Sequence, residues 1–124
     1  MNYVVSGKCC ETKADYVKQL LQTAETVAVI AVENDSSEYE TVDGCTVIDP
    51  RDCRDSVDFR EAVAGAIRNG CDRFVVEDAD ALMENYLDVY EKIGDTGKAI
   101  IVLDDFRTIP AMRFKNAPRV IHLQ

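Results

Sequence analysis

The sequence predicts an α/β fold in which helices cover both faces of a mainly parallel central sheet. Short apolar runs rich in β-branched residues alternate along the chain with segments of helical periodicity, the order expected of strands joined by crossover helices. The runs at residues 26–32 and 99–103 are apolar at nearly every position, as in strands that are buried on both faces. No repeat, low-complexity tract or linker interrupts the pattern, so residues 1–124 are expected to form a single domain.

The expected elements follow from hydrophobic periodicity and from the turn residues between them. Strands are expected at residues 3–5, 26–32, 45–48, 73–76, 99–103 and 119–123. Helices are expected at about residues 12–24, 56–68 and 81–93. The polar, acidic stretch 33–43 and residues 51–55 are expected to be loops.

Composition excludes several classes of protein. The net charge is −9 at pH 7, which argues against a broad nucleic-acid face on the monomer, because duplex binding requires clustered Lys and Arg. No apolar run approaches the ~20 residues of a membrane span, and no signal peptide is evident at the N-terminus. We therefore expect a cytoplasmic protein with no membrane partner.

The five cysteines do not have the C-x-x-C spacing of zinc sites, and the one histidine, His122, is distant from most of them in sequence. A disulfide framework is not expected in a chain without a secretion signal. We interpret the cysteines as small, mostly buried thiols. Cys9 and Cys10 are exceptions, because a helix N-terminus beside them would lower their pKa and raise their reactivity.

A candidate phosphate-binding loop follows the first expected strand. In the pattern G-x-x-x-x-G-K-[ST], Gly7 supplies the first glycine and Lys13 supplies the lysine. Thr12 stands in place of the second glycine and Ala14 in place of the hydroxyl residue. Two of the four defining positions match, so the surroundings decide the weight of the match. Taken alone, Lys13 is typical of a surface lysine in the first turn of a helix.

Acidic pairs follow two later strands at the point where each ends. Glu77 and Asp78 come directly after the fourth expected strand, and Asp104 and Asp105 come after the fifth. Ligands of open parallel sheets bind outside the carboxyl ends of the strands, so these side chains should converge with the candidate loop. Backbone N–H groups and a lysine would hold nucleotide phosphates, and carboxylates would hold Mg²⁺ and polarise water. Either pair alone is more typical of a helix cap or a solvated loop, but their joint occurrence favours a nucleotide site.

The order of these parts resembles that of P-loop NTPases of the additional-strand class. More narrowly it resembles HerA/FtsK-type ATPases, which include DNA-pumping and viral genome-packaging motors. The resemblance covers nearly the whole chain in layout and is carried by residues 6–21 (Walker A loop and first helix), 33–39 (ending in Glu-Tyr), 74–80 (Walker B), 100–105 (the following strand) and 109–123 (the closing segment).

The resemblance implies a three-layer sandwich around a sheet of about five strands in the order 5-1-4-3-2, with ATP and Mg²⁺ as cofactors. The implied nucleotide-binding residues are Gly7, Lys8, Cys9, Cys10, Glu11, Thr12, Lys13 and Ala14. The implied catalytic residues are Glu77, Asp78 and Asp105, and Asp78 would also hold the metal. A ring of identical subunits, and a viral or mobile-element source, are compatible with this family.

Departures from the family pattern weaken hydrolysis more than they weaken the fold. Thr12 restricts the loop backbone, Ala14 removes a Mg²⁺ ligand, and Glu77-Asp78 inverts the usual acidic order. One hypothesis is therefore a nucleotide-binding domain, similar to a translocase-type ATPase, whose hydrolysis is weak or lost. The alternative is a catalytically inactive P-loop-fold module that binds a protein partner. A flavodoxin-like or receiver-like domain, with strand order 2-1-3-4-5, ranks lower, because Ser6-Gly7 stands where receivers carry acidic residues.

Overall fold

The structure is a computed structural model that describes residues 1–31, 44–77, 79–103 and 118–123. Its strands are β1 (Tyr3–Ser6), β2 (Val27–Ile30), β3 (Cys45–Ile48), β4 (Arg73–Val76), β5 (Ala99–Leu103) and β6 (Arg119–His122). Its helices are α1 (Cys10–Leu20), the short 3-10 helix η2 (Pro50–Asp52), α2 (Ser56–Arg68), α3 (Ala79–Asn85) and α4 (Leu87–Asp95).

The strands form one six-stranded sheet in the order β3-β2-β4-β5-β1-β6, and every neighbouring pair is parallel. The prediction of an α/β fold with a parallel sheet is confirmed. The prediction of about five strands in the order 5-1-4-3-2 is wrong as stated, because β3 adds a strand at the edge beside β2. The flavodoxin-like order 2-1-3-4-5 is excluded, because β1 lies between β5 and β6.

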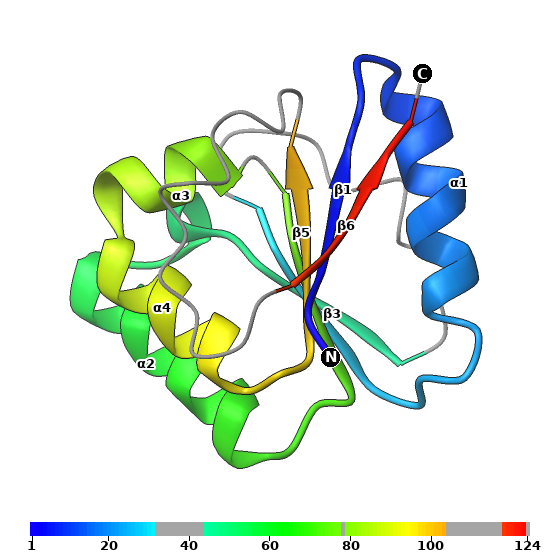
Figure 1. The fold of residues 1–124 in the computed structure, drawn as a ribbon. Coiled ribbons are helices and arrows are strands. Elements are labelled where there is room, and N and C mark those ends of the chain that lie inside the picture. Colours follow the sequence, from blue (N-terminus) through cyan, green and yellow to red (C-terminus); the bar gives the residue numbers. More distant parts are fainter. Residues whose placement is uncertain (32–43, 78, 104–117, 124) are drawn as a thin grey trace.

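The helices lie on two sides of the sheet (Figure 1). Helix α1 packs on one face, and α2, α3 and α4 pack on the other. Side chains alternate along each strand, so neighbouring residues enter different cores. In β1, Val4 belongs to the core under α2, α3 and α4, whereas Val5 belongs to the core under α1. The central strands are therefore buried on both faces, as their continuous apolar sequences predict.

Two helical predictions need correction. Helix α1 begins at Cys10, ahead of the expected start near Thr12. The single helix expected at about residues 81–93 is two helices, because Tyr86 leaves helical geometry with φ −141° and ψ 54°. The Tyr86 ring packs on Phe59 of α2, with centroids 4.7 Å apart. This contact with α2 holds the break that periodicity alone does not reveal.

In the part of the chain that the structure describes, no helix is both long enough and apolar enough to span a bilayer.

Candidate functional site

The candidate site lies at the carboxyl end of the sheet. Because all six strands are parallel, their last residues share one edge of the sheet, at the top of Figure 1. Helix α1 follows β1 onto one face, and α3 follows β4 onto the opposite face. Strand β5 lies between β1 and β4, so the chain departs in opposite directions on its two sides. Ligands of parallel sheets bind where the chain diverges in this way.

The β1–α1 turn consists of Gly7, Lys8 and Cys9, since α1 already begins at Cys10. The Gly7 N–H donates to the Leu103 carbonyl at 3.2 Å, which joins the turn to the end of β5. A Cβ atom on Gly7 would stand 2.9 Å from the Leu123 carbonyl oxygen, so the close approach of the segment after β6 requires a glycine here. Gly7 is therefore fixed by packing, which is a different reason from the phosphate-loop turn that the motif predicts.

Lys13 is buried, with 4% of the residue exposed, although the pattern alone suggests a surface lysine. Its ammonium group donates to the Leu103 carbonyl at 3.3 Å. The same carbonyl accepts from Gly7, so Leu103 links the turn, the helix and β5 at one point. The structure thus brings the lysine of the motif from α1 to the carboxyl end of β5.

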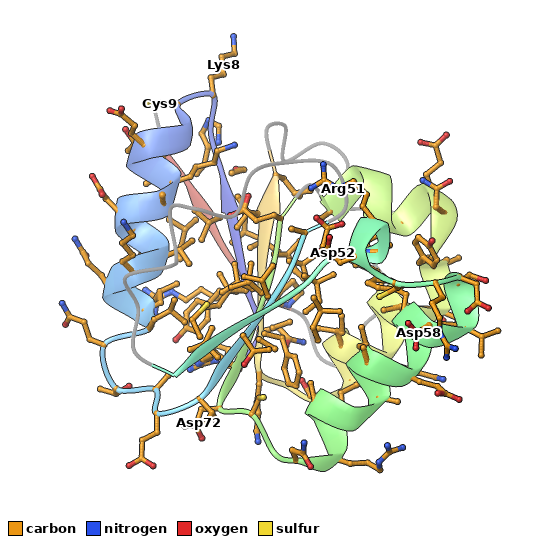
Figure 2. The ribbon with its side chains drawn as sticks, turned by 180° about the vertical axis from the view of Figure 1, so that it is seen from behind. Lys8, Cys9, Arg51, Asp52, Asp58 and Asp72 are labelled. Carbon is orange, nitrogen blue, oxygen red and sulfur yellow. The ribbon has the colours of Figure 1, made fainter. Side chains whose placement is uncertain are left out.

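Of the other residues predicted to bind nucleotide, some are exposed to solvent and one is buried in the core. Lys8, Cys9, Glu11 and Thr12 are exposed, and Figure 2 shows Lys8 and Cys9 at the tip of the turn. The Ala14 side chain packs in the core under α1. The side chain of Cys10 lies outside the described ones.

Cys9 is the N-cap residue of α1. The Thr12 hydroxyl, followed by the Thr12 and Glu11 backbone N–H groups, lowers the pKa of the Cys9 thiol. This direction agrees with the expectation that a helix N-terminus favours the thiolate. Among the described cysteines, Cys9 is the exposed one, whereas Cys45, Cys53 and Cys71 are partly buried.

Glu77 is the one predicted catalytic residue that the structure describes. It is 9% exposed and follows β4, and its backbone N–H donates to the Ile30 carbonyl of β2 at 3.0 Å. Asp78, predicted to hold the metal, and Asp105, predicted to be catalytic, lie outside the described residues. Within the described residues, no group of His, Cys, Asp and Glu side chains is arranged to hold a metal ion.

A polar pair that the sequence does not reveal lies at the same edge. The Ser6 hydroxyl and His122 Nδ1 are 3.0 Å apart, across the paired ends of β1 and β6. Ser6 is fully buried, whereas His122 is exposed. The parallel register of β1 and β6 brings the two residues together, so no local sequence signal could have paired them.

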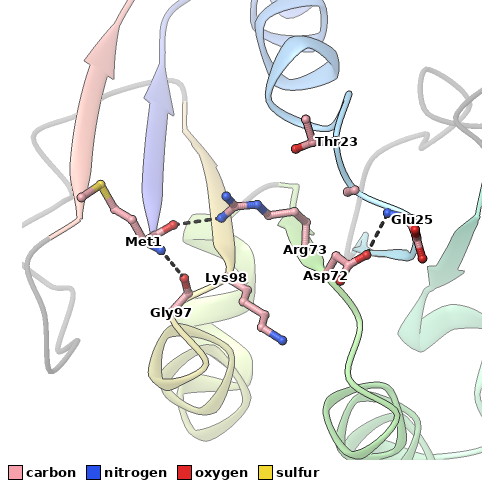
Figure 3. A pocket seen from close by; sticks show the side chains of 8 residues that line it. Met1, Thr23, Glu25, Asp72, Arg73, Gly97 and Lys98 are labelled. Atoms are coloured by element: carbon pink, nitrogen blue, oxygen red, sulfur yellow. Dashed lines mark hydrogen bonds between the residues drawn. The ribbon is translucent and has the colours of Figure 1, made fainter.

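A polar pocket of about 400 Å³ lies at the opposite end of the sheet (Figure 3). The Asp72 carboxylate accepts the N–H groups of Glu25 and Thr26 at 2.8 and 3.2 Å. The Arg73 guanidinium donates to the Met1 carbonyl at 3.0 Å. The charged groups of this pocket therefore join the amino ends of several strands.

No protein-family model matches the chain, and no curated protein and no solved structure is significantly similar to it. The function proposed below therefore rests on the sequence and the geometry alone.

Proposed function

We propose that the chain is a P-loop-like domain that binds nucleotide phosphates weakly at the β1–α1 turn, with hydrolysis weak or lost. The observation that carries the proposal is the position of Lys13. Burying a cation has a free-energy cost, and the ammonium group is nevertheless held at the carboxyl end of β5, beside the turn. A cation in this position, next to a helix N-terminus, suits a phosphate group.

Strand order gives further support. When β3 is left out, the remaining strands follow one another as β2-β4-β5-β1-β6. If these five strands are renumbered 1 to 5 along the chain, their order is 2-3-4-1-5. Read from the opposite edge of the sheet, the same order is 5-1-4-3-2. The first strand thus lies between the last two, as the resemblance to P-loop proteins implies.

The turn itself argues for weak binding. Three residues, Gly7 to Cys9, separate β1 from α1, so few backbone N–H groups can wrap around a phosphate. In the first turn of α1, the N–H groups of Glu11 and Thr12 already face the Cys9 thiol, and the Glu11 carboxylate opposes an anion. Mg²⁺ would offset this repulsion, with Asp78 as its proposed ligand.

Hydrolysis is disfavoured by the place of Ala14. Alanine has no hydroxyl, so this position cannot ligate Mg²⁺ as the corresponding residue of the family does. The methyl group of Ala14 packs instead in the core under α1. The second candidate function is an inactive module of the same fold that acts through a protein partner. The acidic surface, with a net charge of −9, favours a partner over direct contact with nucleic acid.

Calorimetry with ATP, with and without Mg²⁺, tests the proposal. We expect weak saturable binding that Lys13→Met reduces by about tenfold or more, because the side chain keeps its length but loses its charge. Lys92→Met, at an exposed lysine in the last turn of α4, is the matched control and should bind as the wild type does. Urea unfolding of both variants shows that the fold is retained.

The two hypotheses separate in the same experiment. Absence of ATP binding at high protein concentration would refute the phosphate site and leave the interaction module. Mg²⁺-dependent ATP turnover that disappears in Lys13→Met would show instead that hydrolysis is retained.

A further inference from the structure

A groove of about 440 Å³ runs between edge strand β3 and helix α2, on the side of the sheet away from α1. We call it the β3–α2 groove. Its main lining residues are Thr46, Ile48, Cys53, Ala62, Gly65 and Ala66. Its volume falls within the range of about 300–1,000 Å³ that is usual for binding sites.

One side of the groove is the edge of the sheet. The carbonyls of Gly44 and Ile48 accept the N–H groups of Val27, the first residue of β2, and Ala31, directly after β2, at 3.0 and 3.1 Å. Successive residues of a strand direct their backbone groups to opposite sides, so the N–H and C=O of Val47 point away from β2. As a whole residue, Val47 is also 40% exposed. An edge of this kind is a template for another extended segment.

The other side of the groove has little side-chain bulk. Helix α2 presents Ala62, Gly65 and Ala66 to the groove. Among the residues that the structure describes, a Cβ atom on Gly65 would meet only the Arg68 guanidinium, at 3.8 Å, which is an ordinary van der Waals distance. The floor includes Ala28 of β2, which is fully buried. Small apolar side chains of an added strand would fill this space.

The rim of the groove is acidic. Among the described lining residues, Asp49, Asp52 and Glu61 are carboxylates and none is basic. Asp49 is paired with Arg51, whose Nη2 lies 2.6 Å from its carboxylate, whereas Asp52 and Glu61 are both exposed. Figure 2 shows Arg51 and Asp52 close together near the end of β3.

The electrostatic field inside the groove is also negative. Burial, and then the carboxylates of Asp58 and Asp52, raise the pKa of the Cys53 thiol in the groove wall. A basic occupant therefore complements the rim, whereas a second copy of this chain, with a net charge of −9, is repelled.

We propose that the β3–α2 groove binds an extended, basic segment of a partner protein, which pairs with β3 as an added strand. The segment inserts small apolar side chains between β3 and α2, and its lysine or arginine residues lie beside Asp52 and Glu61. This inference is independent of the phosphate site, because no residue of the β1–α1 turn lines the groove.

The test uses a fluorescein-labelled peptide in which valine and threonine alternate, with lysines at both ends. Fluorescence anisotropy should show saturable binding to the wild-type chain, and Gly65→Leu should weaken it by about tenfold or more by filling the groove. Gly65→Ala is the matched control: it removes a helical glycine, adds only a methyl group, and should retain binding. No saturable binding, or equal binding by Gly65→Leu, would overturn the proposal.

Two further arms test the pairing and the charge. Methylation of alternate backbone nitrogens in the peptide keeps its side chains but removes donors to β3, and should weaken binding by about tenfold. Glu61→Gln should weaken binding by about twofold to fivefold, because exposed ion pairs contribute little, whereas Glu84→Gln on α3 should have no effect. Insensitivity to methylation would refute strand pairing.

Sedimentation velocity of the chain without peptide covers the competing occupant. We expect that the chain does not self-associate through the β3–α2 groove. A concentration-dependent dimer that Gly65→Leu abolishes would show that the groove binds a second copy, and would overturn the assignment to a partner segment.

Discussion

Charged side chains lie at both the amino end and the carboxyl end of the parallel sheet, but they make different contacts at the two ends. At the amino end, Asp72 accepts two backbone N–H groups, and Arg73 donates to Met1 and stacks on the Tyr3 ring, 5.4 Å from its centroid. Asp72 joins the start of β4 to the start of the neighbouring β2, and Arg73 reaches past β5 to the start of β1. The pocket in Figure 3 is therefore explained by structural roles for the residues that line it.

At the carboxyl end, the buried charge is less easily explained by stability alone. Lys13 is 4% exposed, and its ammonium group donates to a carbonyl that already accepts from Gly7. Burial of a cation carries a desolvation cost that an apolar side chain of similar size does not, so stability alone is a poor reason to bury a lysine here. The difference between the two ends is one of position: the charged groups of the amino end join strands, whereas Lys13 is buried at the edge where ligands of parallel sheets bind.

The largest effect on the free energy of unfolding is expected from substitution of Asn2, at the amino end of the sheet. Asn2 is 4% exposed; its amide donates to the Gly94 carbonyl at 2.8 Å and accepts from the Ala99 N–H at 2.9 Å. Asn2→Ala leaves both backbone groups without these partners, so the free energy of unfolding should fall by about 2–4 kcal/mol in urea titrations. Asn69→Ala, at the exposed end of α2, is the control. An equal loss in the two variants would contradict a structural role confined to the amino end.

A smaller and pH-dependent effect is expected at Asp72. Backbone hydrogen bonds, first from Glu25 and then from Thr26, lower the pKa of Asp72 below its usual value of about 3.9. Because the folded-state pKa is the lower one, this stabilisation is present above about pH 4 and is lost as pH falls through the folded-state value. The free energy of unfolding of Asp72→Asn should therefore decline less on acidification than that of the wild type.

Urea titrations at several pH values between about 3 and 7 measure this difference. Asp95→Asn, an exposed residue at the end of α4, is the control and should retain the wild-type decline. If the free energy of unfolding has the same pH dependence in the wild type and in Asp72→Asn, the hydrogen bonds from Glu25 and Thr26 to Asp72 do not stabilise the fold.

Much of the fold could be predicted from the sequence, because strand and helix signals are local. The continuous apolar run that becomes β5 and the capped helix α2 appear where periodicity and turn residues predict them. The position of β3 was not predicted, because edge or central placement depends on pairing between distant segments. The break at Tyr86 was missed for a similar reason, since its ring contacts Phe59, which is distant in sequence.

The candidate site was predictable only in part. The motif selects Gly7 and Lys13, and the structure joins both to the Leu103 carbonyl. The motif does not reveal that α1 begins at Cys10, which shortens the turn, or that Ser6 meets His122. The roles predicted for Asp78 and Asp105 stay predictions, because these residues lie outside the described part of the chain.

The most direct test of the central claim is a nuclear magnetic resonance titration of the nitrogen-15-labelled chain with Mg²⁺ and ATP. If phosphate binds at the carboxyl end of the sheet, the largest amide shifts will occur from Lys8 to Lys13, in the β1–α1 turn and the first turn of α1. The amides of Asp72 and Gly97, at the opposite end of the sheet, should remain unchanged. Largest shifts at Asp72 and Gly97, or no shifts at any amide, would contradict a phosphate site at the carboxyl end.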